Sequence, residues 1–181
     1  MGMQQKNGFT MVEFMIAIVV IAIVTAITIV SYSAIRARAE NAKTVQGVKS
    51  YAIAIDNYAI FNKTYPVTAT FPCLGSVSTC ARVAGTTDCF GVGGATTNAA
   101  FNVAIRTIAG ALPEVSTQQI SCGGNLYSGA FYNKNDTSAG KTAQIVYYLK
   151  GNVACEQISN GTIARSQQED LTRCILTLQA L

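Results

Sequence analysis

A long apolar run decides the fold of this chain: residues 9–30 read FTMVEFMIAIVVIAIVTAITIV. Glu13 is the only charged residue in the run, and three threonines are its other polar positions. At about 1.5 Å per residue, a helix over this run reaches roughly 33 Å, enough to cross a hydrocarbon core of about 30 Å. A buried strand of that length would be abnormal. The run therefore predicts a membrane-type helix.

The overall composition limits the function classes that are open. The chain has 181 residues, of which 50% are apolar and 12% charged, which is typical of a folded chain with a core or a membrane segment. It contains no histidine, which excludes Ser/His/Asp and Cys/His catalysis, HExxH zinc sites and Cys₂His₂ fingers. Its net charge of +4 is too small for a strongly basic nucleic-acid-binding domain.

The apolar run has three competing interpretations. A secretory signal peptide has an apolar core of only about 7–15 residues, followed by a small-residue cleavage site. A single-pass anchor explains the length of the run but not Glu13. The third interpretation takes in the residues before the helix. A short polar leader over residues 1–8 contains Lys6 and ends in Gly8, and Phe9 and then Glu13 follow it.

This combination of leader, glycine, aromatic residue, glutamate and unbroken apolar run resembles the N-terminus of type IV pilins and pseudopilins. The resemblance implies that a prepilin peptidase cleaves between Gly8 and Phe9 and that the new amine of Phe9 is N-methylated. It also implies a precursor in the bacterial cytoplasmic membrane, an assembly ATPase with its membrane platform, and a later extracellular filament on the cell surface. The resemblance covers the leader and first helix closely, and the remainder only loosely.

Glu13 needs a partner, because an ionised side chain inside a membrane helix costs about 2.5–3.5 kcal/mol. Thr10 as N-cap and Glu13 as the third helical residue fit a capping box, and Phe9 and Phe14 fit the hydrophobic staple around it. The family resemblance implies a second role, in which Glu13 pairs with the Phe9 amine of a neighbouring subunit. The two roles are compatible. Phe9, Thr10 and Glu13 are therefore the candidate assembly residues.

The charges and the cysteines give opposite indications of topology. More basic residues follow the apolar run than precede it, and a positive-inside count would place the C-terminal side in the cytoplasm. Six cysteines instead indicate an oxidising compartment. We give the cysteines and the leader more weight and expect the C-terminal domain outside. The basic residues themselves predict a solvated helix face or a lipid-headgroup contact, with DNA as the alternative; they are Arg36, Arg38, Lys43 and Lys49.

The helical pattern continues beyond the apolar run. Apolar residues recur at helical spacing from Ser31 to Phe61, and Tyr65-Pro66 ends the pattern. One helix from Thr10 to Phe61 would be about 78 Å long. Many pilins carry proline and glycine in this helix where the chain has Val30 and Ala22, so Gly47 is its one weak point. The predicted divisions are the leader 1–8, a membrane or filament-core helix 9–30, an amphipathic helix 31–63 and a globular head 64–181.

The remainder predicts a small α+β head. Residues 67–98 have the Thr, Ser, Gly and Ala content of a loop, and an amphipathic helix is expected over 98–111 with Thr97 as its N-cap. A long helix packed across a small antiparallel sheet would bury one face of each, which matches the family layout. The expected strands cover residues 130–133, 144–149 and 174–178.

The six cysteines have no CxxC spacing, so they predict neither a zinc site nor a thioredoxin-type centre. Six cysteines allow 15 pairings. We expect Cys155 to pair with Cys174, which would tie the last strand to the sheet, and six buried free thiols are the alternative. Each bridge would stabilise the head by roughly 2–4 kcal/mol. The remaining four would form two bridges; they are Cys73, Cys80, Cys89 and Cys122.

The other motifs are weak, and neither a cofactor nor a metal site is expected. The glycine-rich segment 90–94 lacks the Lys-Ser/Thr of a P-loop, and the acidic residues lack calcium-loop spacing. Three Asn-x-Ser/Thr triplets, starting at Asn62, Asn135 and Asn160, are expected by chance in a chain this rich in Asn and Thr.

Together these features predict a structural protein and not an enzyme: a subunit of a homo-oligomeric, type IV pilus-like filament. Two alternatives stay open, a pseudopilin of a type II secretion-like system and a membrane-anchored extracellular binding module that never polymerises. The sequence does not distinguish a major from a minor subunit. It also leaves open motility, adhesion to a host surface and DNA uptake as the role of the fibre.

Overall fold

The computed structural model describes residues 8–68, 70–76, 79–80, 89–90, 94–134, 142–158 and 161–179. The chain divides into two compact units, Met1–Arg38 and Ala39–Leu181, which we describe separately. The elements in chain order are α1 (Met11–Asn62), β1 (Thr79–Cys80), β2 (Ala95–Thr96), α2 (Ala99–Ala109), β3 (Ile120–Cys122), β4 (Asn125–Tyr127), β5 (Ala130–Asn133), β6 (Thr142–Lys150), β7 (Thr162–Gln168) and β8 (Leu171–Gln179).

The N-terminal unit contains the first half of α1. Its large apolar side chains are exposed on every side of the helix, and none of its most apolar stretch is buried. Among the described residues, α1 is the one helix long and apolar enough to cross a membrane. A helix that is hydrophobic all round is stable only inside a non-aqueous or protein environment. The expected membrane-type helix is therefore present as a continuous helix whose described apolar side chains in this unit are exposed.

The C-terminal unit is built on a four-stranded antiparallel sheet with the order β5-β6-β8-β7. The central strands β6 and β8 pair over their full length, from Thr142 opposite Gln179 to Lys150 opposite Leu171. The predicted α+β fold is confirmed, and the predicted strand over residues 130–133 has the bounds of β5. Strands β6 and β8 are longer than predicted. Strand β7 was not predicted, because it is an exposed edge strand with the polar sequence TIARSQQ.

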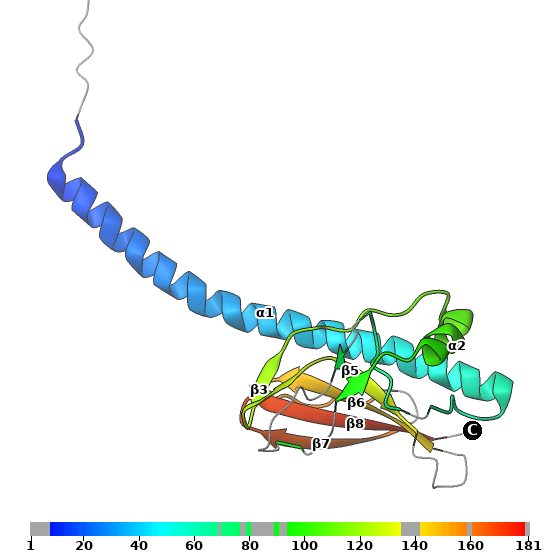
Figure 1. Cartoon of the computed structure of the whole chain (residues 1–181). Helices are drawn as coiled ribbons and strands as arrows, with labels where there is room; N and C mark the ends of the chain where they lie inside the picture. The colour runs from blue at the N-terminus through cyan, green and yellow to red at the C-terminus, as the bar shows by residue number, and fades with distance from the viewer. Residues whose placement is uncertain are drawn as a thin grey trace, which may run out of the picture. The chain divides into compact units, whose positions relative to one another are not determined.

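One face of this sheet packs against the second half of α1. From Ala39 onward, α1 lies along the sheet (Figure 1), and its residues between Val45 and Ile55 enter the larger core. Every second residue of the central strands points toward the helix. The sheet residues in this core are Ala130, Tyr132, Ala143, Ile145, Tyr147, Leu149, Cys174, Leu176 and Leu178.

The opposite face of the sheet is also buried, which the sequence analysis did not predict. The alternate residues Phe131, Val146 and Tyr148 enter a second core with the cysteine-rich segment and the β3–β4 hairpin. The physical reason lies in β6, where Ile145 to Leu149 are apolar or aromatic without alternation and all are buried. A strand of that pattern must be covered on both sides.

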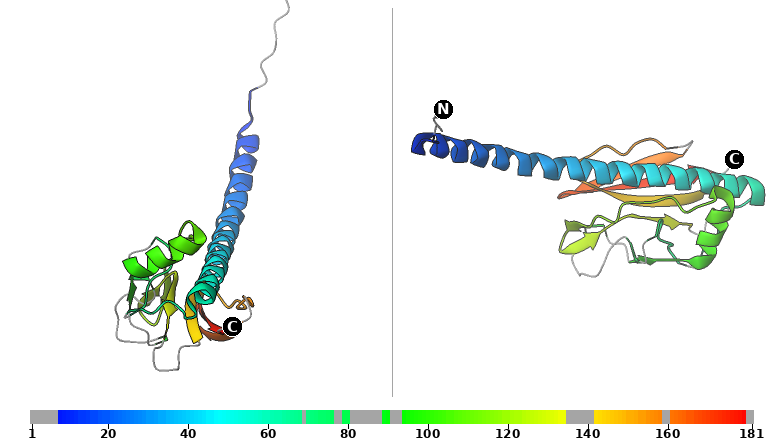
Figure 2. Two further views of the ribbon diagram at one scale, coloured as in Figure 1. Left: turned by 90° about the vertical axis from the view of Figure 1, so that its right-hand side faces the viewer. Right: turned by 90° about the horizontal axis from the view of Figure 1, so that it is seen from above.

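Helix α2 joins the larger core through Phe101 and Ile105 and lies beside the C-terminal end of α1 (Figure 2). Phe101 stacks on Tyr132 of β5 with ring centroids 4.9 Å apart. The N-cap is Asn98 and not the predicted Thr97, because the Asn98 carboxamide accepts a hydrogen bond from the Phe101 backbone N–H at 3.0 Å. Asn98 is three residues before Phe101, the spacing at which an N-cap side chain reaches an unpaired N–H.

Candidate functional site: the processing and assembly segment and its stapled head

The predicted cleavage bond lies in an exposed, non-helical segment. Gly8 and Phe9 precede the first residue of α1, and the Phe9 side chain is 81% exposed. A Cβ atom added at Gly8 would meet no other atom within 4 Å. The packing of the chain therefore does not require glycine at this position, so a requirement for Gly8 would come from the enzyme that reads it. The rest of the predicted leader, residues 1–7, lies outside the described residues.

The first turn of α1 is closed by the predicted capping box. The Thr10 backbone N–H donates to Glu13 Oε2 at 2.9 Å, and the Thr10 hydroxyl donates to the same oxygen at 2.8 Å. In return, the Glu13 backbone N–H donates to Thr10 Oγ1 at 3.3 Å. These bonds satisfy N–H groups that have no partner within the helix. The staple between Phe9 and Phe14 stays a prediction.

The capping box leaves part of the Glu13 carboxylate available. Both bonds from Thr10 end on Oε2, whereas an ionised carboxylate offers about four lone-pair sites on its two oxygens. The residue is also exposed. Glu13 can therefore keep its cap and accept a further hydrogen bond from a cationic donor. Cleavage before Phe9 would create such a donor, since it produces a primary amine, which is protonated at neutral pH and stays cationic after N-methylation.

The hydroxyl groups inside the apolar run are satisfied within the helix. Thr25 Oγ1 donates to the Ile21 carbonyl and Thr28 Oγ1 to the Val24 carbonyl, each at 2.7 Å. In lipid or in a protein core, an unpaired hydroxyl would cost free energy, and this back-bonding removes that cost. The two threonines are thus compatible with burial of the whole run.

All six cysteines of the head are paired. Cys155 bonds to Cys174, which is the pair expected from the sequence, and no cysteine is free. The other two bridges are Cys73–Cys80 and Cys89–Cys122. The first joins residues 7 apart in sequence and the second residues 33 apart, so the second constrains far more of the chain.

The Cys155–Cys174 bridge is one of several attachments that hold the segment 151–158. Lys49 of α1 forms an ion pair with Glu156 at 2.8 Å, and Arg165 Nε of β7 donates to the Val153 carbonyl at 2.8 Å. The segment therefore connects α1, β7 and β8. These contacts position the unpredicted edge strand against the rest of the head.

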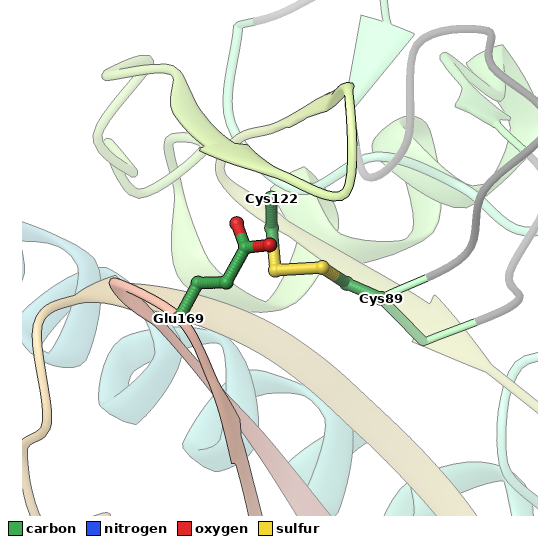
Figure 3. Close-up of side chains that lie close together, drawn as sticks. All are labelled: Cys89, Cys122 and Glu169. Carbon is green, nitrogen blue, oxygen red and sulfur yellow. A yellow bond between two sulfur atoms is a disulfide. The ribbon is translucent and has the colours of Figure 1, made fainter.

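A cluster of Cys89, Cys122 and Glu169 has the residue types of a metal site (Figure 3). The two sulfur atoms are bonded to each other, so neither is available as a thiolate ligand. The Glu169 carboxylate instead accepts a hydrogen bond from the Gly123 backbone N–H at 3.2 Å. The cluster thus attaches the turn between β7 and β8 to the β3–β4 hairpin.

The strongly perturbed titratable groups of the head are buried tyrosines. Desolvation raises the pKa of Tyr147 to about 12, with a further contribution from the negative charge of Glu156. Desolvation also raises the pKa of Asp56, against the hydrogen bond that Tyr65 donates to it at 3.3 Å. These shifts follow from burial in the core, which is a structural role.

Two weaker sequence motifs extend beyond the described residues. Residues 91–93 of the glycine-rich segment, the whole Asn-x-Thr triplet at 135–137 and the first residue of the triplet at 160–162 lie outside them. Asn62, the start of the third triplet, ends α1, and its carboxamide donates to the Tyr58 carbonyl at 3.0 Å.

Comparison with family models gives one match. Residues 3–29 match the prokaryotic N-terminal methylation motif, the leader class of type IV pilins and pseudopilins. Neither the curated proteins nor the solved structures gave a match to the chain. The matched residues include the predicted cleavage bond, the capping box and most of the apolar run. They support a pilin-like or pseudopilin precursor anchored in a membrane and processed by a prepilin peptidase.

Proposed function

We propose that the chain is a subunit of a type IV pilus-like filament, assembled from membrane-held precursors after cleavage between Gly8 and Phe9. The single observation that carries this proposal is the methylation motif over residues 3–29, followed by a helix half whose large apolar side chains are exposed at every described position from Phe9 to Ile27. The motif supplies the processing step. The helix supplies the surface through which subunits associate.

The apolar half of α1 has two environments in this proposal. In the precursor it lies in the membrane, where lipid tails cover its exposed side chains. In the filament the same side chains pack against helices of neighbouring subunits. Lipid tails are as apolar as the neighbours, so the exchange gains little from the hydrophobic effect and relies on close packing. The assembly ATPase and membrane platform implied by the motif would supply the work of extraction.

Glu13 fixes the register of the incoming subunit. Its carboxylate is held by Thr10 and has spare acceptor capacity, while the Phe9 amine of a neighbour brings a positive charge. A charge left unpaired in an apolar interior costs several kcal/mol. An axial position of the subunit that pairs the Glu13 carboxylate with the Phe9 amine is therefore strongly favoured over positions that leave both charges unpaired. The pair thus selects one axial position among the many that apolar packing alone would allow.

The three disulfide bonds of the head are consistent with an extracellular location. Three disulfides in one head are typical of a protein that folds and stays in an oxidising compartment. They constrain the cysteine-bearing segments of the head, which would help the head to resist proteases and shear.

Substitutions at Glu13 and Thr10 test the assembly role. Glu13→Ala removes both the cap and the charge, Glu13→Gln keeps an acceptor for the Thr10 N–H but removes the charge, and Thr10→Ala removes only the hydroxyl. We expect both Glu13 variants to lose most of the fibres that can be sheared from cells, and Thr10→Ala to keep most of them. Wild-type fibre yield from Glu13→Gln would show that only the cap matters and would overturn the pairing role.

The same cells distinguish the two alternatives. A pseudopilin predicts loss of protein secretion in the deletion strain and few fibres in the parent. A binding module that never polymerises predicts an uncut leader and no effect of Glu13→Ala.

A further inference from the structure

Four basic residues of α1 follow the apolar run, and they fall into two pairs. Lys43 and Lys49 form ion pairs with acids of the head, Glu114 at 3.7 Å and Glu156 at 2.8 Å. Arg36 and Arg38 are exposed and, within the part of the chain that the structure describes, have no acidic partner. The sequence places no acid between Glu13 and Glu40. Two positive charges therefore stand uncompensated on this part of the helix.

These two arginines lie at a defined distance from the apolar run. Counted from Val30, their Cα atoms are about 9 and 12 Å further along the helix axis. The headgroup layer extends roughly 5–8 Å beyond the hydrocarbon core on each side of a bilayer. Side chains of a helix point toward its N-terminus, and long arginine side chains bring their charge back by about one turn, roughly 5 Å. Both guanidinium groups consequently reach the level of the lipid phosphates.

Tyr32 marks the same interface. It comes shortly after the end of the apolar run, and its side chain is 67% exposed. Tyrosine is enriched at the level of lipid headgroups, because its ring suits the apolar boundary and its hydroxyl suits water. An exposed tyrosine followed by two exposed arginines is thus the order of residues that a membrane boundary favours.

We propose that Tyr32, Arg36 and Arg38 form a headgroup anchor that binds the phosphates of anionic phospholipids at the C-terminal end of the apolar segment. The guanidinium group matches a phosphate in geometry and charge and can bind it through two parallel hydrogen bonds. Anionic lipids are favoured over zwitterionic ones, since the latter carry their own cation beside the phosphate. The anchor sets the depth of the precursor and must be released when the subunit is extracted. This inference rests on the membrane stage of the proposed function.

Lipid selectivity of the full chain tests the anchor. The chain is inserted into vesicles of phosphatidylcholine and phosphatidylglycerol in equal amounts, and the association of spin-labelled forms of each lipid is compared by electron paramagnetic resonance. We expect a preference for phosphatidylglycerol of about fivefold per arginine, the factor that corresponds to roughly 1 kcal/mol for a basic side chain near an anionic surface. The preference should fall in high salt, because screening shortens the range of the attraction.

A matched pair of variants isolates the arginines. One double variant is Arg36→Gln/Arg38→Gln, and the other is Lys43→Gln/Lys49→Gln. Each removes two positive charges from α1, at different positions. The arginine variant should lose most of the preference, whereas the lysine variant should keep it, because its charges are already paired within the head. Near-ultraviolet circular dichroism checks that both heads are folded.

Three results would overturn the anchor. The first is an arginine variant with undiminished selectivity, and the second is a wild-type chain that resists carbonate extraction but shows no selectivity; both would leave the membrane stage intact. The third is a wild-type chain that carbonate removes from the vesicles, which would overturn the membrane stage and the anchor together.

Discussion

Gly47 offers a sharp test of how α1 is held in the head. It lies in α1, where glycine normally weakens a helix, and the segment after α2 crosses it closely. A Cβ atom at this position would lie 2.2 Å from the Glu114 carbonyl oxygen and 2.9 Å from Val115 Cγ2. Real Cβ atoms essentially never approach another heavy atom closer than 3.0 Å, so the contact with the Glu114 carbonyl oxygen is far too short and the one with Val115 lies just below the limit. Glycine is therefore present because only a hydrogen atom fits between the helix and the crossing backbone.

The expected magnitude for Gly47→Ala is the balance of two terms. Alanine is better than glycine in a helix by about 1 kcal/mol. Against this, the crossing backbone must move by about 1 Å, and overpacking of this kind typically costs 1–3 kcal/mol. The displacement also strains the hydrogen bond that Ser116 Oγ donates to Glu40 Oε2 at 2.7 Å, worth about another 1 kcal/mol. Together these terms give a net loss of about 1–3 kcal/mol in the free energy of unfolding.

Thermal unfolding of the full chain in detergent measures this loss, with near-ultraviolet circular dichroism of the head tyrosines as the signal. The melting temperature should fall by about 2–4 °C per kcal/mol for a chain of this size, and so by roughly 2–12 °C in total. Asn57→Ala is the control, because Asn57 is an exposed position of the same helix, and alanine there should leave the stability unchanged or slightly raised. A Gly47→Ala chain as stable as the wild type or more stable would refute the close crossing.

Three further predictions concern the head. Replacing Cys155 and Cys174 by alanine should lower the free energy of unfolding by about 3 kcal/mol, since the bridge joins residues 19 apart, and a chemical denaturation curve checks this. Asn41→Ala should cost about 1–3 kcal/mol in the same assay, because the Asn41 carboxamide forms two hydrogen bonds with the backbone of Lys150, at 2.9 and 2.8 Å. Tyr147 should ionise at an unusually high pH, because burial raises its pKa from 10.0 to about 12. Its contribution to the free energy of unfolding is therefore fully present below pH 10.0 and is lost as the pH rises toward about 12. Absorbance of tyrosinate during alkaline titration, with Tyr147→Phe as the comparison, measures this pKa, and denaturation curves at several pH values measure the loss of stability.

The elements that the sequence predicted best are those with strong local signals. The capping box depends on residues three apart, Thr10 and Glu13, and the structure contains both of its directions. The strand over residues 130–133 and the centre of β6 were found because aromatic and branched residues cluster there. Such features depend on residues that are close in sequence, so they can be predicted from a single sequence.

The features that were missed depend on contacts between distant segments. Strand β7 has a polar sequence and becomes a strand because it pairs with β8 along its whole length. The second core forms because the cysteine-bearing segment packs on the outer face of the sheet. No local sequence pattern predicts this packing. Gly47 looked like a weak point of the helix, whereas its reason is the backbone of Glu114, which is remote in sequence.

The central claim is that the chain is cut, exported and polymerised. The most direct test is the intact mass and N-terminal sequence of protein sheared from the surface of cells. We predict a chain that begins at N-methylated Phe9 and lacks the six hydrogens that three disulfides remove. A chain that stays with the cells and still begins at Met1 would contradict the proposal and leave a membrane-anchored domain that does not polymerise.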